Sequence, residues 1–291
     1  MKDSDWIILD ELYKNPNITK VAGQLYITQP TLTKRLQAIE DEFQIRIVNR
    51  STKGVEFTRE GEYLAAQAKQ YLRFMKETRD GIRGLKKEGC GTIRIAASYT
   101  FSKFQLSEIL YSYGRLHPNL CFEIQNLRSH ELMGLVADGE ADVGFVRGNY
   151  DISLKKCLIL RENAYVLCKS PITLDRLPEL PMVRSALGNY TQRVMDQWWN
   201  QHFDTPPNVD TLVQDVDICW RLVSRGIGYT LSFLQEYQLQ ELGMFYLPML
   251  HPDGSHIERN TWFVYDGHKA APDYVTDFIR HIEGHYAIES A

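Results

Sequence analysis

The sequence predicts an α/β protein in two parts: a small winged helix-turn-helix with a long helix after it, and then a larger domain of alternating strands and helices. Three observations support this prediction. Apolar residues recur at helical spacing within residues 27–43, a heptad-like row runs through residues 59–87, and strand-type segments alternate with helical ones from residue 92 onward. A chain of 291 residues is long enough for two or three domains.

The first 58 residues predict short helices joined by tight turns. Ser4 can cap a helix that runs to about Lys14, and Thr19 can cap a second helix. A third helix is predicted after Thr28, with Pro30 in its first turn, where the missing N–H costs little. The buried stripe expected for this third helix consists of Leu32, Leu36, Ile39 and Phe43.

The opposite face of the third helix is polar and basic near its N-terminus. Amide, hydroxyl and cationic side chains there are donors suited to base edges and phosphates. The segment IRIVNRSTKGVEFT alternates and turns at Lys53-Gly54, which predicts a two-stranded wing. The predicted DNA-binding residues are Thr28, Gln29, Pro30, Thr31, Thr33, Lys34, Arg35, Arg50 and Lys53.

The charge distribution agrees with a DNA-binding surface on the third helix but does not by itself indicate one. Residues 1–91 carry 16 basic and 13 acidic side chains, whereas the remaining 200 residues carry 17 and 24. Residues 14–59 alone hold 8 basic and 4 acidic side chains. On charge alone, an ordinary solvated surface is the simpler interpretation.

A long helix is predicted from about residue 59 to residue 87, capped by Thr58. Its heptad-like row advances in steps of three and four residues, which is typical of a pairing seam between two chains. We therefore expect a homodimer. The glycines in KEGCG, residues 87–91, predict a hinge after this helix. The predicted seam consists of Gly61, Leu64, Ala68, Tyr71, Met75, Thr78, Ile82 and Leu85.

The remaining 200 residues predict parallel βαβ units. Strands are expected at residues 92–98, 121–126, 141–146, 164–169, 181–185, 209–214, 226–232 and 260–266. Helices are expected at residues 102–116, 129–138, 191–203, 215–225 and 272–284.

Parallel sheets bind ligands beyond the carboxyl ends of their strands, near helix N-termini. Hydroxyl, amide and arginine groups at those positions suit a small carboxylate or another anion. For Ser98 or Ser129 alone, a simple helix cap is an equally good explanation. The predicted effector-binding residues are Ser98, Tyr99, Thr100, Phe101, Arg128, Ser129, Arg147, Gly188, Asn189, Tyr190 and Thr191.

Several classes of site are not predicted. The five cysteines lack disulfide or zinc spacing, and HIEGH at residues 281–285 lacks a third metal ligand. Gly226-Ile227-Gly228 lacks the third glycine of a dinucleotide fingerprint, and no activated nucleophile is evident. We therefore expect no metal, no cofactor and no enzymatic activity. Without a signal peptide or an apolar span, a cytoplasmic protein with no membrane partner is expected.

The segment NITKVAGQLYITQPTLTKRLQAIEDEFQIRIVNRSTKGVEFTREGEYL, residues 17–64, resembles the LysR-type bacterial transcriptional regulators. The family pattern there is of the type AAxxLxxSQPAxSxxIxxLExxLGxxLFxRxxxxxxLTxAG. Thr28 and Thr33 stand where serine is usual but keep the hydroxyl group, and Gln44 replaces a glycine. The segment VSRGIGYTLSF is similar to the family's glycine-rich strand, with Phe233 where proline is common.

The resemblance implies a DNA-binding regulator controlled by a small-molecule effector. The hydroxyl, amide and arginine groups predicted at the strand ends favour a small anionic metabolite as this effector. It implies a winged helix-turn-helix at residues 1–58, a linker helix at 59–88, and a periplasmic-binding-protein-like effector domain at 89–291. Subdomain I is expected at residues 92–160 and 235–291, and subdomain II at 161–234, joined by two crossover strands.

The expected partners are double-stranded DNA with an imperfect palindrome and a second copy of the chain, with dimers assembling further into tetramers; RNA polymerase is a further candidate partner. The alternatives are a solute-binding or transport component built on the C-terminal cleft and an enzyme with a fused regulatory arm. Neither alternative accounts for residues 18–58.

Overall fold

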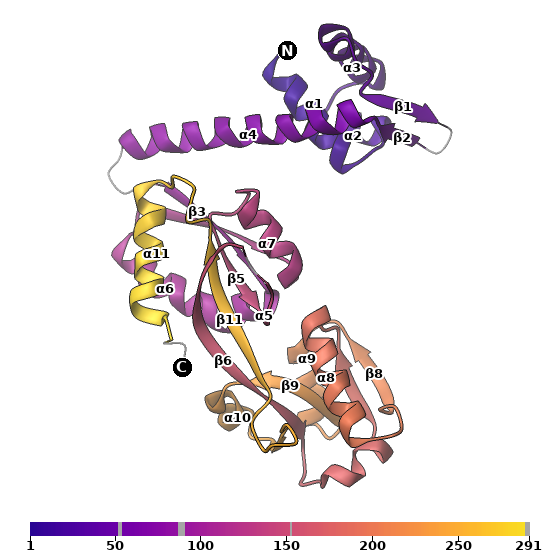
Figure 1. Ribbon diagram of the computed structural model, residues 1–291, viewed down its shortest axis with the longest axis vertical. Coiled ribbons are helices and arrows are strands. Elements are labelled where there is room, and N and C mark those ends of the chain that lie inside the picture. The colour runs from indigo at the N-terminus through magenta and orange to yellow at the C-terminus, as the bar shows by residue number, and fades with distance from the viewer. Residues whose placement is uncertain (52–53, 87–90, 152, 289–291) are drawn as a thin grey trace. The chain divides into compact units, whose positions relative to one another are not determined.

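The computed structural model of the chain describes residues 1–51, 54–86, 91–151 and 153–288. The chain divides into two compact units, Met1–Glu88 and Gly89–Ala291. Figure 1 shows the elements of each unit. Among the described residues, no helix combines the length and the apolar character that crossing a membrane would need.

The first unit contains the predicted helix-turn-helix and wing. Asn17 rather than Thr19 caps the second helix, because the Asn17 Oδ1 accepts the backbone N–H of Lys20 at 3.0 Å. The first helix begins at Asp3, one residue before the predicted cap at Ser4. Its described elements are α1 (Asp3–Lys14), α2 (Ile18–Gln24), α3 (Gln29–Phe43), β1 (Val48–Ser51), β2 (Gly54–Phe57) and α4 (Arg59–Lys86), with β1 and β2 antiparallel.

The apolar stripe of α3 forms part of the core of this unit. Leu32, Leu36 and Ile39 are at most 1% exposed and pack in one cluster with Leu9 and Leu12 of α1. The prediction that Phe43 continues this stripe is wrong, because Phe43 is 43% exposed. It is the last residue of α3, and Gln44 ends the helix in a left-handed conformation.

The first half of α4 packs on its own unit, contrary to the expectation of a pairing seam along the whole helix. A Cβ on Gly61 would lie 2.1 Å from the carbonyl oxygen of Ile47, so the helix approaches the wing as closely as only glycine allows. Leu64 and Ala68 are buried in the core of the unit.

Tyr71 of the predicted seam also contacts its own unit. Its ring centroid lies 5.2 Å from that of Trp6, and its hydroxyl donates to Asp3 at 2.8 Å. In the second half of the helix, by contrast, Phe74 and Ile82 are more than half exposed. The second half of α4 therefore still offers apolar surface to a partner.

The second unit is built on one continuous mixed sheet with the order β4-β3-β5-β11-β6-β9-β7-β8, to which β10 adds beside β6. The first elements are β3 (Gly91–Ala97), α5 (Tyr99–Phe101), η1 (Ser102–Leu106), α6 (Ser107–Leu116), β4 (Leu120–Asn126), α7 (Ser129–Ala137), β5 (Val143–Arg147) and β6 (Lys155–Cys168). The next are η2 (Leu174–Glu179), β7 (Met182–Ser185), α8 (Asn189–His202), β8 (Val209–Val213), α9 (Val216–Ser224) and β9 (Tyr229–Leu234). The last are α10 (Glu236–Leu242), β10 (Phe245–Pro248), β11 (Glu258–Tyr265) and α11 (Asp273–Tyr286).

The long strands β6 and β11 run side by side between two lobes of this unit (Figure 1). The predicted parallel pairs are present within each lobe, where β3 pairs with β4 and β5, and β7 with β8 and β9. The connecting strands pair antiparallel instead, and the register of β6 against β11 shifts between Thr261 and Trp262.

The expected division of this unit needs one correction. Residues 235–249 were assigned to the first subdomain, but Leu239 and Met244 pack with the second-lobe residues Tyr165 and Trp220. Strand β10 also pairs with the second-lobe end of β6, where Phe245 lies opposite Cys168. The chain therefore returns to the first lobe only along β11.

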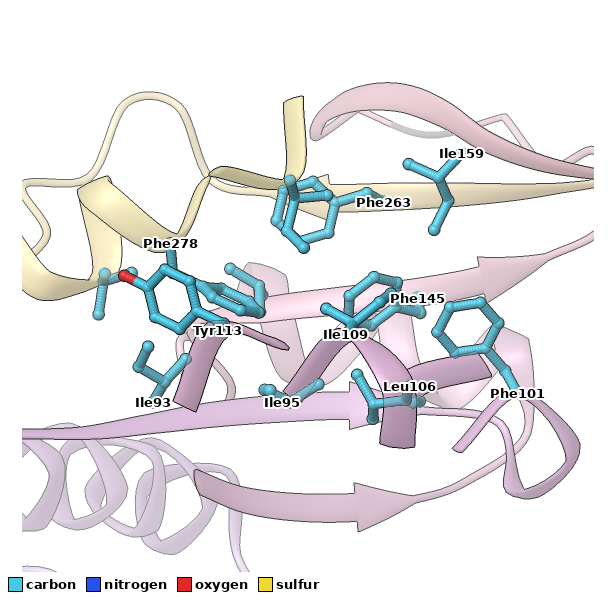
Figure 2. Close-up of a cluster of buried hydrophobic side chains, with 14 of the residues drawn as sticks. Ile93, Ile95, Phe101, Leu106, Ile109, Tyr113, Phe145, Ile159, Phe263 and Phe278 are labelled. Atoms are coloured by element: carbon cyan, nitrogen blue, oxygen red, sulfur yellow. The ribbon is translucent and has the colours of Figure 1, made fainter. Parts of the chain in front are cut away.

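An aromatic core holds the first lobe together on the face covered by α6 and α11. Figure 2 shows Phe145 of the sheet between Phe263 and Phe101, with Tyr113 and Phe278 to one side of them. Phe101 and Phe145 stack with centroids 4.7 Å apart, and Tyr113 meets Phe278 edge to face at 5.0 Å. This core fixes the ends of β3 and β5, from which the polar side chains of the cavity project.

Candidate functional site

The N-terminus of α3 presents a polar surface on the first unit. Thr28 caps the helix, since its Oγ1 accepts the backbone N–H of Thr31 at 3.4 Å. Gln29, Thr31 and Lys34 are exposed on the first two turns. Exposed amide and hydroxyl side chains with a lysine beside them suit phosphate and base-edge contacts.

Arg35 has a structural partner that its position in the sequence did not reveal. Its Nη1 lies 3.3 Å from the Oδ1 of Asp5, which is only 5% exposed. The other oxygen of Asp5 accepts the backbone N–H of Lys2 at 2.7 Å. Arg35 therefore ties α3 to α1, and Lys34 is the better placed of the two cations for meeting a polyanion.

The remaining predicted residues of this face are placed as follows. Pro30 is exposed in the first turn of α3, and Thr33 is half-buried. The backbone of Arg50 pairs with Val55 in the wing. Lys53 lies outside the described residues.

Tyr26, in the turn between α2 and α3, was not predicted as a DNA-binding residue from the sequence. Its side chain is 97% exposed, and its backbone adopts a positive φ of 54°. A non-glycine residue costs about 1–2 kcal/mol in this left-handed region. The tyrosine ring packs against no described residue that would offset this strain, and glycine or asparagine would fit the backbone better. Such conflicts between local preference and fold concentrate at functional sites.

A cavity of about 410 Å³ lies between the lobes of the second unit. This volume is in the range of small-molecule sites. The carboxyl ends of β3, β4 and β5 border it from the first lobe, and the start of α8 borders it from the second, as predicted. The predicted residues that line it are Ser98, Tyr99, Thr100, Arg128, Ser129, Arg147, Gly188 and Thr191.

Three predicted effector residues are not among the described residues that line this cavity. Phe101 is 1% exposed and belongs to the aromatic core, so its assignment to the site is wrong. Asn189 is exposed at the start of α8. Tyr190 lies beside Tyr150, with ring centroids 5.8 Å apart, and packs over Gly148.

A buried cluster of charged side chains lies beside the cavity, and its two arginines, Arg147 and Arg259, line it. Arg147 ends β5, whereas Glu162 and Arg259 lie on the connecting strands β6 and β11. All three side chains are at most 9% exposed. Arg147 Nη2 donates to Glu162 Oε1, and Arg259 Nη2 donates to Glu162 Oε2 at 2.9 Å. Thr191 on α8 accepts from Arg259 at 3.2 Å, so the cluster connects both lobes.

The charge states of this cluster follow from its contacts. Burial alone would raise the pKa of Glu162, but the two adjacent arginines outweigh burial and hold this pKa below its usual value. Burial and the charge of Arg147 lower the pKa of Arg259 to about 10, which leaves the guanidinium protonated at neutral pH. Two positive charges thus share one negative charge. The Nε of Arg147 is buried without a hydrogen-bond partner.

Glu162, Arg259 and Phe233 at this site were not predicted from the sequence. Phe233 stands where the family commonly has proline, and it is 3% exposed within the continuous strand β9. Its ring lies 4.5 Å from the Arg259 guanidinium. The charged run Arg161-Glu162 interrupted the apolar pattern of β6. This charged pair within an apolar segment was the one signal in the sequence, but it did not identify the partners of Glu162.

Comparison with known proteins agrees with both halves of this description. Residues 4–62 match the bacterial regulatory helix-turn-helix protein of the lysR family, and residues 86–287 match the LysR substrate binding domain. These domains define a DNA-binding transcriptional regulator with an effector-binding domain. The chain belongs to the LysR family.

Relatives of known sequence and structure span nearly the whole chain. The HTH-type transcriptional regulator YraN of Bacillus subtilis is 30% identical over 285 residues, which is 98% of each chain. The HTH-type regulator BenM of Acinetobacter baylyi is 26% identical over 254 residues, 81% of this chain and 82% of BenM. The full-length structure of CbnR complexed with its target DNA shares the fold with a TM-score of 0.69 at 16% identity, covering 98% and 99% of the two chains.

Proposed function

We propose that this regulator binds a small anionic metabolite in the cavity of the second unit, and that binding controls how α3 and the wing engage DNA. The observation that carries the proposal is the buried Arg147–Glu162–Arg259 cluster, whose net positive charge borders the cavity. An uncompensated buried charge is costly, so a cavity of this kind favours an anion.

The DNA contacts in this proposal come from Tyr26, Gln29, Thr31 and Lys34, with backbone contacts from Arg50 and Lys53 in the wing. Gln29, Thr31 and Lys34 supply amide and hydroxyl groups and a cation on the first turns of α3, and Tyr26 adds an aromatic group from the preceding turn. In this proposal Arg35 does not contact DNA; it holds α3 against α1 and so keeps the DNA-binding side chains in place.

The assembly follows from α4. We propose a homodimer through the exposed apolar side chains of its second half, and an imperfect palindrome as the DNA site, because a twofold dimer meets two half-sites. Association of two dimers into a tetramer and contact with RNA polymerase are further parts of this proposal. Residues 1–58, 59–88 and 89–291 would serve as DNA-binding, linker and effector segments of a cytoplasmic regulator that catalyses no reaction.

Capture of genomic DNA tests the proposed DNA-binding surface. Sheared genomic DNA is passed over the full chain at one moderate salt concentration, and the retained fragments are sequenced. We expect a few palindromic intergenic fragments to be enriched by the wild type and lost with Lys34→Ala. Lys169→Ala, which removes the same charge from an exposed position in the second unit, is the matched control. Uniform weak retention by all three proteins would contradict the proposal.

A further inference from the structure

The buried charges beside the cavity do not balance, although the set that includes the exposed rim is neutral. Arg147 and Arg259 carry two positive charges, and Glu162 carries the one negative charge within hydrogen-bonding distance of them. The cavity rim carries Arg128, His130, Glu131 and Asp215, which are exposed or half-exposed. Water screens the rim charges, so the excess of one positive charge in the buried cluster remains.

The two guanidinium groups differ in how many hydrogen bonds the structure gives them. Arg259 makes three, because its Nε and Nη2 donate to Glu162 and its Nη1 donates to Thr191. Arg147 donates to Glu162 through Nη2, and its Nε is buried with no partner. Arg147 lines the cavity. An acid group entering the cavity would therefore find its hydrogen-bond donor at Arg147.

The geometry points to an effector with a single negative charge: a small organic monoanion whose acid group binds Arg147 and whose uncharged remainder fills the cavity. This inference rests on the proposed function and narrows it to one charge class. One negative charge makes the cluster neutral, whereas a second would lie beside Glu162 without a cation of its own. Glu162 thereby acts as a built-in counter-charge that selects against dianions.

The rest of the cavity wall fits an uncharged organic body. Met195, Leu231 and Phe233 line it and are at most 5% exposed, and Trp220 lines it at 6%. The Phe233 ring covers one face of the Arg259 guanidinium at 4.5 Å. A volume of about 410 Å³ is much larger than a bare inorganic ion needs.

The test compares three probes of similar size that differ in charge. Pentanoate and butanesulfonate are monoanions, and butanesulfonate has a tetrahedral head group like that of a phosphate ester. Propyl phosphate is a dianion at pH 8, because the second pKa of a phosphate monoester is about 6. Binding of each probe to the full chain is measured by titration calorimetry at pH 8. We expect both monoanions to bind about tenfold or more tightly than propyl phosphate.

The variant Glu162→Gln removes the counter-charge while keeping the shape of the side chain. Its cluster then carries two positive charges, so the preference for monoanions should shrink by about tenfold or reverse. Glu241→Gln makes the same change at an exposed position on α10 in the same unit and should leave the preference unchanged. If Glu162→Gln does not fold, the wild-type ratio of the three affinities tests the inference by itself.

The outcomes separate this inference from the proposed function. Tighter binding of monoanions that disappears in Arg147→Met supports both. Equal or tighter binding of propyl phosphate that also depends on Arg147 overturns the charge class and leaves an anion-binding cavity. Binding of no probe, or binding that survives in Arg147→Met, overturns both. DNA capture by each variant shows separately whether the first unit is intact.

Discussion

The proposed DNA-binding surface and the proposed ligand cavity are built in opposite ways. Most of the proposed surface comes from one short stretch, Thr28 to Lys34, whose order along the chain is also its order along α3. The charged cluster beside the cavity joins Arg147, Glu162 and Arg259 from three strands, and the hydrogen-bonded partners Glu162 and Arg259 lie 97 positions apart in the chain. A local site can be recognised from spacing, whereas an assembled site depends on the sheet topology that brings its members together.

The largest effect is expected from breaking the assembled site. Glu162→Gln leaves Arg147 and Arg259 buried together without their shared counter-charge. Removing one member of a buried ion cluster typically costs about 3–5 kcal/mol. Urea unfolding of the full chain, followed by tryptophan fluorescence, should show this loss in the second unit. A loss below about 1 kcal/mol would mean that water already solvates the cluster.

Acidification sharpens the same comparison. Because the arginines hold the pKa of Glu162 below its usual value of 4.5 despite burial, the carboxylate stabilises the fold above the unfolded-state pKa. This contribution is lost as the pH falls through the lower folded-state pKa. The melting temperature of the wild type should therefore fall more steeply below about pH 4.5 than that of Glu162→Gln. Parallel pH profiles would contradict this explanation.

In the first unit, Gly61→Ala should have the largest effect. The added Cβ would lie 2.1 Å from the carbonyl oxygen of Ile47, so α4 must shift away from the wing. Overpacking of this kind costs about 1–3 kcal/mol. Gly23→Ala on α2 meets no atom within 4 Å and should be neutral or slightly stabilising. Equal unfolding midpoints for the two variants would show that the close approach of α4 is not required.

Arg35→Ala should have a similar cost, about 1–3 kcal/mol, because it leaves the buried Oδ1 of Asp5 without its cation. A double-mutant cycle with Asp5→Ala isolates the pair. A coupling energy near zero would contradict the structural role of Arg35 and make it a candidate for DNA contact again. DNA affinity measured alongside separates a loss of fold from a loss of contacts.

The smallest effect on stability is expected at Tyr26. Tyr26→Asn should stabilise the first unit by about 1 kcal/mol, because asparagine tolerates the positive φ better. The same change should weaken DNA binding about twofold to tenfold by removing one contact. A variant that is more stable and binds DNA as well as the wild type would leave the exposed tyrosine without a function.

The difference between local and assembled sites also explains which parts of the structure could be predicted from the sequence. The cap at Thr28 and the buried residues Leu32, Leu36 and Ile39 were predicted correctly, because they depend on helical spacing. Phe43 and the first half of α4 were misassigned, because which face is covered depends on the neighbouring helix and wing. Phe101 follows a strand as a binding residue would, but its apolar ring is drawn into the aromatic core.

The strand β6 illustrates the remaining difficulty. Its first nine residues were not predicted as strand, since Arg161 and Glu162 break the apolar pattern. Buried charges on a strand are stable only beside partners, and those partners lie on β5 and β11. No spacing rule connects positions so far apart in the chain, so this part of the site required the structure.

The central claim is that DNA contact and anion binding reside in separate units but are coupled. The most direct measurement is the affinity of the full chain for a captured palindromic fragment, with and without saturating pentanoate, at one fixed salt concentration. We predict that the acid changes this affinity for the wild type, that Lys34→Ala binds weakly in both conditions, and that Arg147→Met binds like the wild type without acid and does not respond to it. An unchanged response in Arg147→Met, or unchanged affinity in Lys34→Ala, would contradict the account.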